Sequence, residues 1–185
     1  FKCATIAEAE MLGQCNAPDV LLAYQPMGPK IDRFLHLMEK YSQTRYSCLV
    51  DNMDSARDIS SRAEAFHVTV PVFIDLNVGM NRTGIAAGPP AMELIEQIEK
   101  LPGIRVVGLH VYDGHIHTVD LDERKRECDE AFRPVLEMNR KLQELGYALT
   151  IVAGGSPTFP IHIRRMNVEC SPGTFIYWDK GYQDM

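Results

Sequence analysis

Residues 105–117 read RVVGLHVYDGHIH, an apolar run that turns abruptly into a polar cluster. The first part, up to Tyr112, is rich in β-branched and apolar side chains, which indicates a buried strand. The second part places a phenol, a carboxylate and two imidazoles around Gly114. The stretch therefore predicts a strand whose carboxyl end carries a chemically active loop.

The same pattern, a strand followed by a loop of small or polar residues, occurs three more times. DLNVGMNRTG covers residues 75–84, AGGSPT covers 153–158 and CSPGT covers 170–174. Amphipathic segments separate the strands, and this alternation predicts βαβ units with a parallel sheet. An open doubly wound sheet and a TIM-type (β/α)8 barrel both satisfy it. The chain length favours the open sheet, whereas active loops at the ends of several strands favour the barrel.

Apolar, β-branched runs give the expected strands. They are Lys2 to Ala4, Val20 to Tyr24, Tyr46 to Asp51, Val70 to Leu76, Arg105 to Tyr112, Ala148 to Ala153, Val168 to Cys170 and Phe175 to Trp178. Local signals also predict where helices begin and end. They are a capping box at Thr5 and Glu8, a proline start at Pro89 and Pro90 for a helix ending near Leu101, and a long helix from Asp120 or Asp122 to Leu145, ended by Gly146.

Composition excludes several classes of protein. The 185 residues are enough for one domain with a buried core, and a net charge of -6 argues against a nucleic-acid partner. Neither an apolar run of about 20 residues nor a signal peptide is evident, so we expect no membrane partner and a cytoplasmic location. The five cysteines form no CxxC pair, which is typical of reduced thiols.

The polar cluster at residues 112–117 has two interpretations. His115 and His117 lie two positions apart on an extended segment, so they point the same way, and Asp113 adds an oxygen ligand. A catalytic zinc site needs three protein ligands, however, and the nearest other histidine, His110, lies inside the preceding strand. The alternative is a polar loop with hydrogen-bonded histidines, and we predict no metal ligand within this chain. The remaining histidines, on helices or at helix ends, are more typical of surface or satisfied core positions: His36, His67 and His162.

Small residues in two neighbouring loops predict a phosphate site, because their backbone N–H groups and hydroxyls can surround an anion. The alternative is that each Gly-rich turn is only a turn. The candidates are Gly154, Gly155, Ser156, Thr158, Ser171, Gly173 and Thr174. In residues 75–84 the single cation, Arg82, lies between Gly79 and Gly84, which indicates either a role at the strand end or a salt bridge to Asp75.

Together these loops resemble the fold-type III enzymes that use pyridoxal 5′-phosphate (PLP), in the alanine racemase N-terminal domain superfamily. The similarity is to the D-threonine aldolase and D-serine dehydratase branch. Five segments carry it in the family's order and cover nearly the whole chain. They are KCATIAEAE (2–10), DLNVGMNRTG (75–84), GLHVYDGH (108–115), GGSPT (154–158) and ECSPGTFIYWD (169–179).

The resemblance implies roles for individual residues. Arg82 matches an arginine near the cofactor's phenolate oxygen, and Tyr112 matches a racemase histidine that faces the pyridine ring. Ser156 and the pair Gly173-Thr174 match the phosphate-binding serine and backbone. Where racemases place an arginine against the pyridine nitrogen, this sequence has Ser171, which cannot supply an obligate cation. That departure favours the aldolase and dehydratase branch.

Two family features fall outside the sequence. The family's Schiff-base lysine precedes the KCAT segment, and Lys2 matches the KCAT lysine instead. The ligands of a divalent metal, manganese or zinc, come from a C-terminal β domain in the relatives. We therefore expect residues 1–185 to be a single PLP-binding barrel domain, incomplete because its first strand is missing, and inactive by itself.

The resemblance implies a PLP-dependent lyase acting on D-β-hydroxy amino acids. The reaction is retro-aldol cleavage to glycine and an aldehyde, as in D-threonine aldolase, or dehydration of D-serine. Tyr112, His115 and His117 are the catalytic candidates. The two histidines suit acid/base roles because imidazole titrates near neutral pH. An amino-acid racemase of the alanine racemase type and a non-catalytic PLP-binding regulatory protein are the alternatives. We expect a small D-amino acid as substrate and a homodimer as the intact form.

Overall fold

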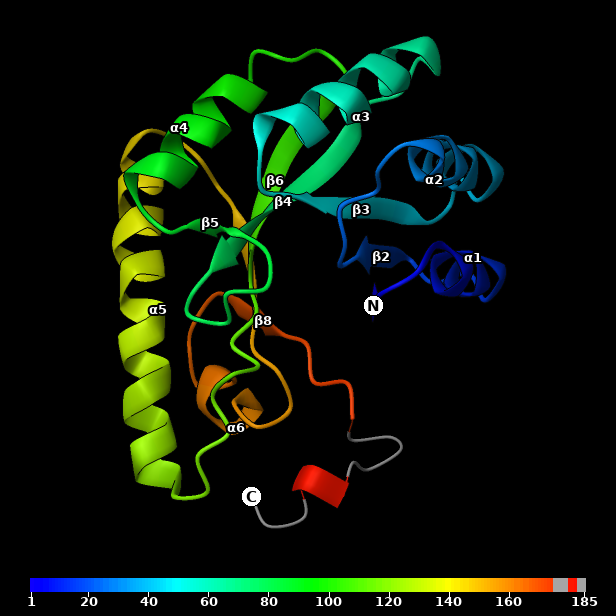
Figure 1. Cartoon of the computed structure of the whole chain (residues 1–185). Coiled ribbons are helices and arrows are strands. Elements are labelled where there is room, and N and C mark those ends of the chain that lie inside the picture. The colour runs from blue at the N-terminus through cyan, green and yellow to red at the C-terminus, as the bar shows by residue number, and fades with distance from the viewer. Residues whose placement is uncertain (175–179, 183–185) are drawn as a thin grey trace. The chain divides into compact units, whose positions relative to one another are not determined.

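The fold is described from a computed structural model, which describes residues 1–174 and 180–182 (Figure 1). The chain falls into two compact units. Unit 1 holds residues 1–74 and 93–107, and unit 2 holds residues 75–92 and 108–185. The boundary passes through two long strands, so that each strand begins in unit 1 and ends in unit 2. The carboxyl ends of these strands, where the candidate residues lie, therefore belong to unit 2.

Strands and helices alternate along the chain, as the sequence predicts. Up to the first long strand the elements are β1 (Lys2–Cys3), α1 (Ile6–Gln14), β2 (Asp19–Leu22), α2 (Pro29–Lys40), β3 (Arg45–Val50), α3 (Met53–Ala65) and β4 (Val70–Asn77). After it come β5 (Ile85–Ala86), α4 (Pro89–Ile98), β6 (Ile104–Val111), α5 (Leu121–Glu144), β7 (Thr150–Ala153), α6 (Phe159–His162), β8 (Val168–Cys170) and the 3-10 turn η1 (Lys180–Tyr182).

The strand order decides between the two fold classes. Hydrogen-bonded strands follow the order β1-β2-β3-β4-β6-β7-β8, with the short β5 beside β4, and the described registers are all parallel. A doubly wound sheet reverses its strand order at a switch point, whereas this order runs in one direction throughout. The barrel type of winding is therefore confirmed. Among the described residues β5 is the one strand that was not predicted, and the strand expected at Phe175 to Trp178 lies outside the described residues.

Helix boundaries follow from local hydrogen bonds. Thr5 Oγ1 accepts from the Glu8 N–H at 3.2 Å, and Glu8 Oε2 accepts from the Thr5 N–H at 3.0 Å, which completes the capping box of α1. Asp120 caps α5 by accepting from the Glu123 N–H at 2.8 Å. The chain leaves α5 through Gly146 with φ +92°, a conformation that favours glycine.

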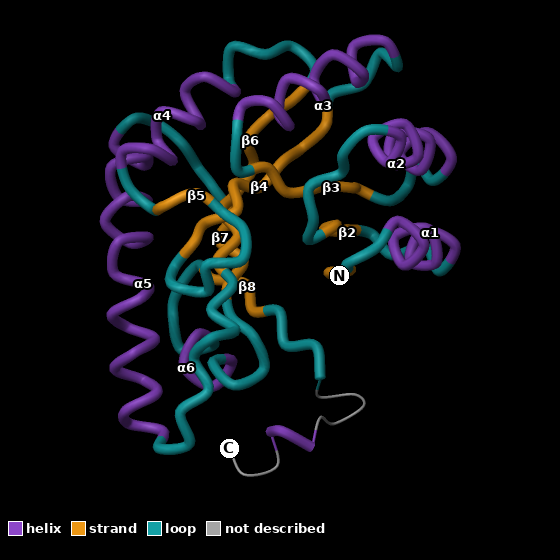
Figure 2. Tube along the Cα trace, in the orientation of Figure 1, coloured by secondary structure: helices purple, strands orange, loops and turns teal. Residues whose placement is uncertain are grey.

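Each unit has its own buried strands. In unit 1, α1 packs against α2 and α2 against α3, and Figure 2 shows α1 and α2 side by side beyond β2 and β3. In unit 2, all four residues of β6 from Gly108 to Val111 are buried, as in the sheet of a barrel that is covered on both faces. No helix among the described residues is long and apolar enough to cross a membrane.

Candidate active site

Tyr112 and Arg82 lie together in unit 2. Tyr112 directly follows β6, and the guanidinium carbon of Arg82 lies 4.9 Å from the centroid of the tyrosine ring. This is within the range of a cation–π contact. The two side chains share a small hollow, whose full lining is Asp75, Leu76, Met80, Arg82, Thr83 and Tyr112. The structure thus brings together two residues that the sequence separates by 30 positions.

A buried carboxylate holds the loop that carries Arg82. Asp75 Oδ1 accepts from His110 Nδ1 at 2.7 Å, and Asp75 Oδ2 accepts from the Thr83 hydroxyl at 2.7 Å. Asp75 and His110 are both nearly inaccessible to solvent. We call these three residues the Asp75 cluster. Gly84 closes the loop at φ +98°, where a Cβ atom would lie 2.7 Å from the Asn77 nitrogen. The loop is therefore fixed at both ends of residues 75–84.

The two small-residue loops meet at Ser156. Its Oγ accepts from the Gly173 N–H at 3.3 Å, the Thr174 N–H at 3.2 Å and the Thr174 hydroxyl at 2.6 Å. Ser171 contributes from the same loop by donating its hydroxyl proton to the Gly154 carbonyl at 3.1 Å. Two N–H groups and the Thr174 hydroxyl thus converge on the Ser156 hydroxyl, which gathers at one point the kinds of donor that phosphate sites use.

Tyr112 also touches the first of these loops. A Cβ atom on Gly155 would lie 3.3 Å from Cε2 of the tyrosine ring, and one on Gly114 would lie 2.4 Å from its Cζ. Glycine at both positions therefore leaves room for the ring. The contact joins Arg82, Tyr112 and the loop of residues 154–158 into one continuous site within unit 2.

Thr158 and the Gly155 N–H contact a second buried carboxylate. Asp113 Oδ1 accepts from the Thr158 hydroxyl at 2.7 Å and from the Gly155 N–H at 3.2 Å. Its other oxygen, Oδ2, lies 2.8 Å from His162 Nε2. Thr158 and His162 are fully buried, and Asp113 is 2 % exposed. The structure therefore places Thr158 with this carboxylate and leaves Ser156 as the hydroxyl that meets the other loop.

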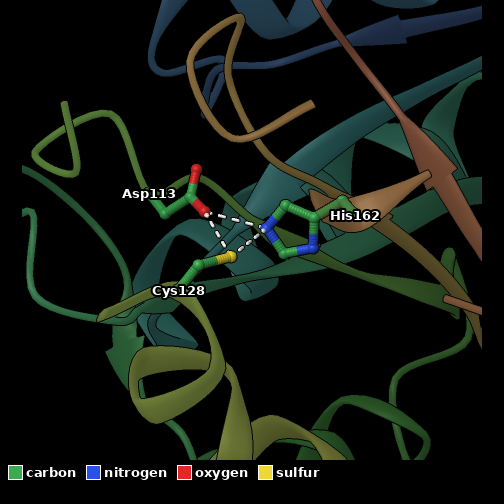
Figure 3. Close-up of side chains that lie close together, drawn as sticks. All are labelled: Asp113, Cys128 and His162. Atoms are coloured by element: carbon green, nitrogen blue, oxygen red, sulfur yellow. Dashed lines mark hydrogen bonds and ion pairs between the residues drawn. The ribbon is translucent and has the colours of Figure 1, made fainter. Parts of the chain in front are cut away.

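A thiol completes this second cluster. Cys128 Sγ, from α5, lies 3.3 Å from His162 Nε2 and 3.8 Å from Asp113 Oδ2 (Figure 3). We call Asp113, Cys128, Thr158 and His162 the Asp113 cluster. Among the described residues it is the only group of three His, Cys, Asp or Glu side chains close enough together to hold a metal ion.

Charge and burial oppose one another at Asp113. Burial raises the pKa of its carboxyl group, but the hydrogen bonds from His162, Thr158 and the Gly155 N–H outweigh this and hold the pKa below its ordinary value. Burial, reinforced by the negative charge of Asp113, raises the pKa of the Cys128 thiol to about 11. The cluster therefore contains a carboxylate anion and a neutral thiol at pH 7.

His115 and His117 line a different hollow. It is an open depression of about 460 Å³, whose other lining residues are Ile116, Thr118, Glu127, Glu130 and Ala131. It shares no lining residue with the hollow around Arg82 and Tyr112. His117 Nδ1 donates to the His115 carbonyl at 2.7 Å, and His115 Nδ1 is buried with no hydrogen-bond partner among the described residues. A Cβ atom on Gly79 would lie 2.6 Å from His115 Nε2, so this ring contacts the Arg82 loop.

Comparison with known proteins gives the family. Residues 1–180 match the alanine racemase N-terminal domain. The chain belongs to this family. It is 28 % identical over 155 residues to a 3-hydroxy-D-aspartate aldolase of Paracoccus denitrificans and 25 % identical over 154 residues to a D-threonine aldolase of an Arthrobacter species. Each alignment covers 83 % of this chain and 40 % of the relative, so the chain spans about two fifths of their length.

Solved structures agree with the family. A D-threonine aldolase from Filomicrobium marinum superposes with a TM-score of 0.89 at 27 % identity, over 99 % of this chain and 50 % of that one. A D-threo-3-hydroxyaspartate dehydratase from Delftia sp. HT23 gives 0.77 at 21 % identity, over 98 % and 48 %, which supports the fold. The predicted TIM-type barrel, incomplete in this chain, and the membership in the fold-type III PLP enzymes are both confirmed.

The residues of the site fit the cofactor of this family. Ser156, Gly173 and Thr174 supply converging donors for a phosphate, and Arg82 and Tyr112 supply a cation and an aromatic face beside them. Two residues of the Asp113 cluster, Cys128 and His162, were not candidates from the sequence. They lie 34 positions apart, on α5 and at the end of the four-residue α6, and no local pattern links them.

Proposed function

We propose that the protein containing this chain is a PLP-dependent lyase that acts on D-β-hydroxy amino acids. It would cleave the Cα–Cβ bond to give glycine and an aldehyde, or eliminate the β-hydroxyl group. The convergence of Gly173 and Thr174 on Ser156, beside the stacked pair Arg82 and Tyr112, is the observation that carries the proposal. The relatives named as aldolases and the dehydratase point to the same class of reaction.

Each loop would hold a different part of the cofactor. Ser156, Gly173 and Thr174 would bind the phosphate, with Gly154, Gly155, Thr158 and Ser171 shaping the two loops around it. Tyr112 would lie against the ring, and Arg82 would bind near the phenolate oxygen. When bound, PLP supplies an electron sink for the charge that develops at Cα.

Ser171 favours the lyase over the racemase. Its hydroxyl donates to the Gly154 carbonyl at 3.1 Å, so it ties the second loop to the first. A neutral hydroxyl in this bond cannot act as the fixed cation that the racemases place here. The alanine racemase of Clostridium perfringens strain SM101 matches 77 % of this chain at 26 % identity, a shorter match than the 83 % matched by the two aldolases.

His117 and His115 are proposed as the groups that move protons on the substrate side. Because His117 Nδ1 donates to a carbonyl, its Nε2 is an acceptor in the neutral ring and suits a base. The buried Nδ1 of His115 has no hydrogen-bond partner among the described residues, so no local bond fixes its tautomer. His117→Ala should lower turnover with D-threonine and D-serine. Unchanged turnover would remove His117 from the mechanism.

The test is product analysis with the complete protein and PLP. We expect glycine and acetaldehyde from D-threonine, or a 2-oxo acid and ammonia from D-serine, and little product from the L-isomers. Conversion of D- to L-alanine without release of an aldehyde would identify a racemase instead. Bound PLP absorbance without product from any D-amino acid would identify a regulatory PLP carrier.

The remaining proposals concern the intact protein. We propose that residues 1–185 form one barrel domain of a longer, cytoplasmic, homodimeric enzyme with a divalent metal, manganese or zinc, bound by a further domain. An intact mass well above the 20.9 kDa of this chain is the expected result. Size-exclusion chromatography with light scattering and elemental analysis test the dimer and the metal. A monomer or a metal-free active enzyme would contradict the corresponding part.

A further inference from the structure

We propose that Asp113 is a positioning residue that sets the shape of the phosphate-binding loop and thereby the enzyme's preference for a phosphorylated cofactor. The inference rests on the proposed PLP function and adds to it a buried residue that does not touch the cofactor. Asp113 follows Tyr112 directly, so one short segment would contribute the ring contact and, one residue later, the support of the phosphate loop.

One oxygen of Asp113 ties the loop at two points. Oδ1 accepts from the Gly155 N–H at 3.2 Å and from the Thr158 hydroxyl at 2.7 Å. Ser156, whose hydroxyl meets Gly173 and Thr174, lies between these two attachments. The backbone around Ser156 is therefore held from both sides by one carboxylate oxygen.

The other oxygen is held by His162, and a neighbouring arginine fixes the direction of that bond. Arg165 Nε, which can only donate, lies 3.3 Å from His162 Nδ1. His162 Nδ1 is consequently the acceptor, and its Nε2 carries the proton that points to Asp113 Oδ2 at 2.8 Å. Asp113 thus receives a hydrogen bond on each oxygen, which keeps it an oriented anion.

The histidine ring supports the loop directly as well. Gly154 has φ +83°, and a Cβ atom there would lie 2.8 Å from His162 Cδ2 and 3.1 Å from Thr158 Oγ1. The first residue of the loop therefore lies over the ring. Behind it, Phe132 packs edge-on to His162, with ring centroids 5.0 Å apart. The Asp113 cluster is a packed support under the loop.

The same atoms are close enough to hold a metal, but their protons argue for a hydrogen-bonded cluster. A metal ligand needs a bare Nε2, whereas Arg165 makes Nδ1 the acceptor and leaves the proton on Nε2. A guanidinium nitrogen of Arg165 also lies 3.8 Å from Cys128 Sγ, where it would repel a second cation. The raised pKa of the Cys128 thiol agrees with a protonated sulfur.

The experiment compares two ligands that differ only in the phosphate. Equilibrium dialysis of the complete protein measures its affinities for PLP and for pyridoxal. The ratio of the affinity for PLP to that for pyridoxal gives the contribution of the phosphate. Ser156→Ala removes the central phosphate contact and serves as the reference variant. Asp113→Asn and Thr158→Val should lower the ratio by at least about tenfold, because each breaks a bond that holds the loop. Affinity for pyridoxal alone should change little.

Two matched variants separate positioning from general damage. Thr158→Ser keeps the hydroxyl and should restore the wild-type ratio. Asp32→Asn removes a carboxylate of unit 1 that binds Arg62, at 2.8 Å, and touches neither the loop nor the Asp113 cluster, so its ratio should stay at the wild-type value. Circular dichroism confirms the fold of each variant. If Asp113→Asn does not fold, Thr158→Val against Thr158→Ser decides the question.

The outcomes distinguish the two proposals. If Ser156→Ala leaves the ratio unchanged, the loops around Ser156 do not bind the phosphate, and this part of the proposed function is contradicted. If Ser156→Ala lowers the ratio but Asp113→Asn and Thr158→Val, both folded, do not, the positioning role of Asp113 is overturned. One equivalent of tightly bound metal that disappears in Cys128→Ala would also overturn it, since the cluster would then be a metal centre.

Discussion

Two buried aspartates hold loops of unit 2 with the same chemical groups but over very different stretches of chain. Asp75 binds a histidine 35 residues away, His110, and a threonine only 8 residues away, Thr83. Asp113 binds a histidine and a threonine that are 49 and 45 residues away, His162 and Thr158. In each case the aspartate lies at or just beyond the carboxyl end of a strand. The difference lies in the threonine, which is a near neighbour in sequence at Asp75 and comes from a distant segment at Asp113.

This difference assigns the two clusters different tasks. The Thr83 contact closes the Asp75 loop within one connection, so the loop that carries Arg82 is locally defined. The Asp113 cluster gathers residues from three separate segments: the loop after β6, α5, and the loop and helix after β7, where Thr158 and His162 lie. Bringing such distant segments together costs conformational entropy, and only the interactions of the complete fold offset that cost. The conformation of the phosphate loop therefore depends on the folding of the other segments of unit 2.

The largest effect is expected from removing the histidine of either cluster. His162→Ala leaves the buried Asp113 carboxylate without its Nε2 donor, and breaking a buried pair in this way costs about 3–5 kcal/mol of unfolding free energy. His110→Ala should be costly at Asp75 for the same reason. Urea unfolding, monitored by circular dichroism, measures the loss of unfolding free energy in both variants.

The exposed His36, which lies 2.7 Å from the Asp32 carbonyl, provides the control variant, and His36→Ala should cost less than about 0.5 kcal/mol. A loss below about 1 kcal/mol for His162→Ala would show that Asp113 does not depend on this donor. A similar result for His110→Ala alone would end the parallel between the two clusters.

The comparison also shows what the sequence could predict. The longer strands, the capping box of α1 and the positions of the small-residue loops depend on neighbouring residues, and they were predicted to within a few residues. The separate roles of Arg82 and Tyr112 came from the family resemblance, and their contact is seen only in the structure. Cys128 and His162 escaped prediction because their partners are set by tertiary packing, and the four-residue α6 is too short to show a helical period. The two-residue β5 was missed for the same reason.

A smaller effect is expected from the threonines. Thr158→Val keeps the shape of the side chain but removes a fully buried hydroxyl that donates to a charged group, which should cost about 2 kcal/mol. Thr83→Val removes the corresponding donor to Asp75 from a partly exposed position and should cost about 1 kcal/mol. Unfolding free energies in urea test the order. An equal or reversed order would mean that burial does not distinguish the two clusters.

Acid should remove the contribution of Asp113. The folded pKa of its carboxyl group lies below the ordinary value of about 3.9, so its stabilisation is fully present above about pH 4 and is lost as the pH falls through the folded pKa. The stability difference between wild type and Asp113→Asn should therefore be constant from pH 7 to 5 and shrink below pH 4. A difference that stays constant down to pH 3 would contradict the assignment.

The smallest change tests whether the Asp113 cluster opens independently of the Asp75 cluster. Cys128 is 1 % exposed and its thiol pKa is raised to about 11, whereas Cys15 is exposed. Because the thiolate is the reactive form, an alkylating reagent at pH 8 should label Cys15 quickly and Cys128 at least about 100-fold more slowly, as mass spectrometry of peptides would show.

His162→Ala should accelerate labelling of Cys128, since it removes the ring beside the sulfur. His110→Ala should not, because its cluster contains no contact to this thiol among the described bonds. Equal acceleration by both variants would mean that the two clusters open as one cooperative region, and the distinction between a locally defined and an assembled loop would then be lost.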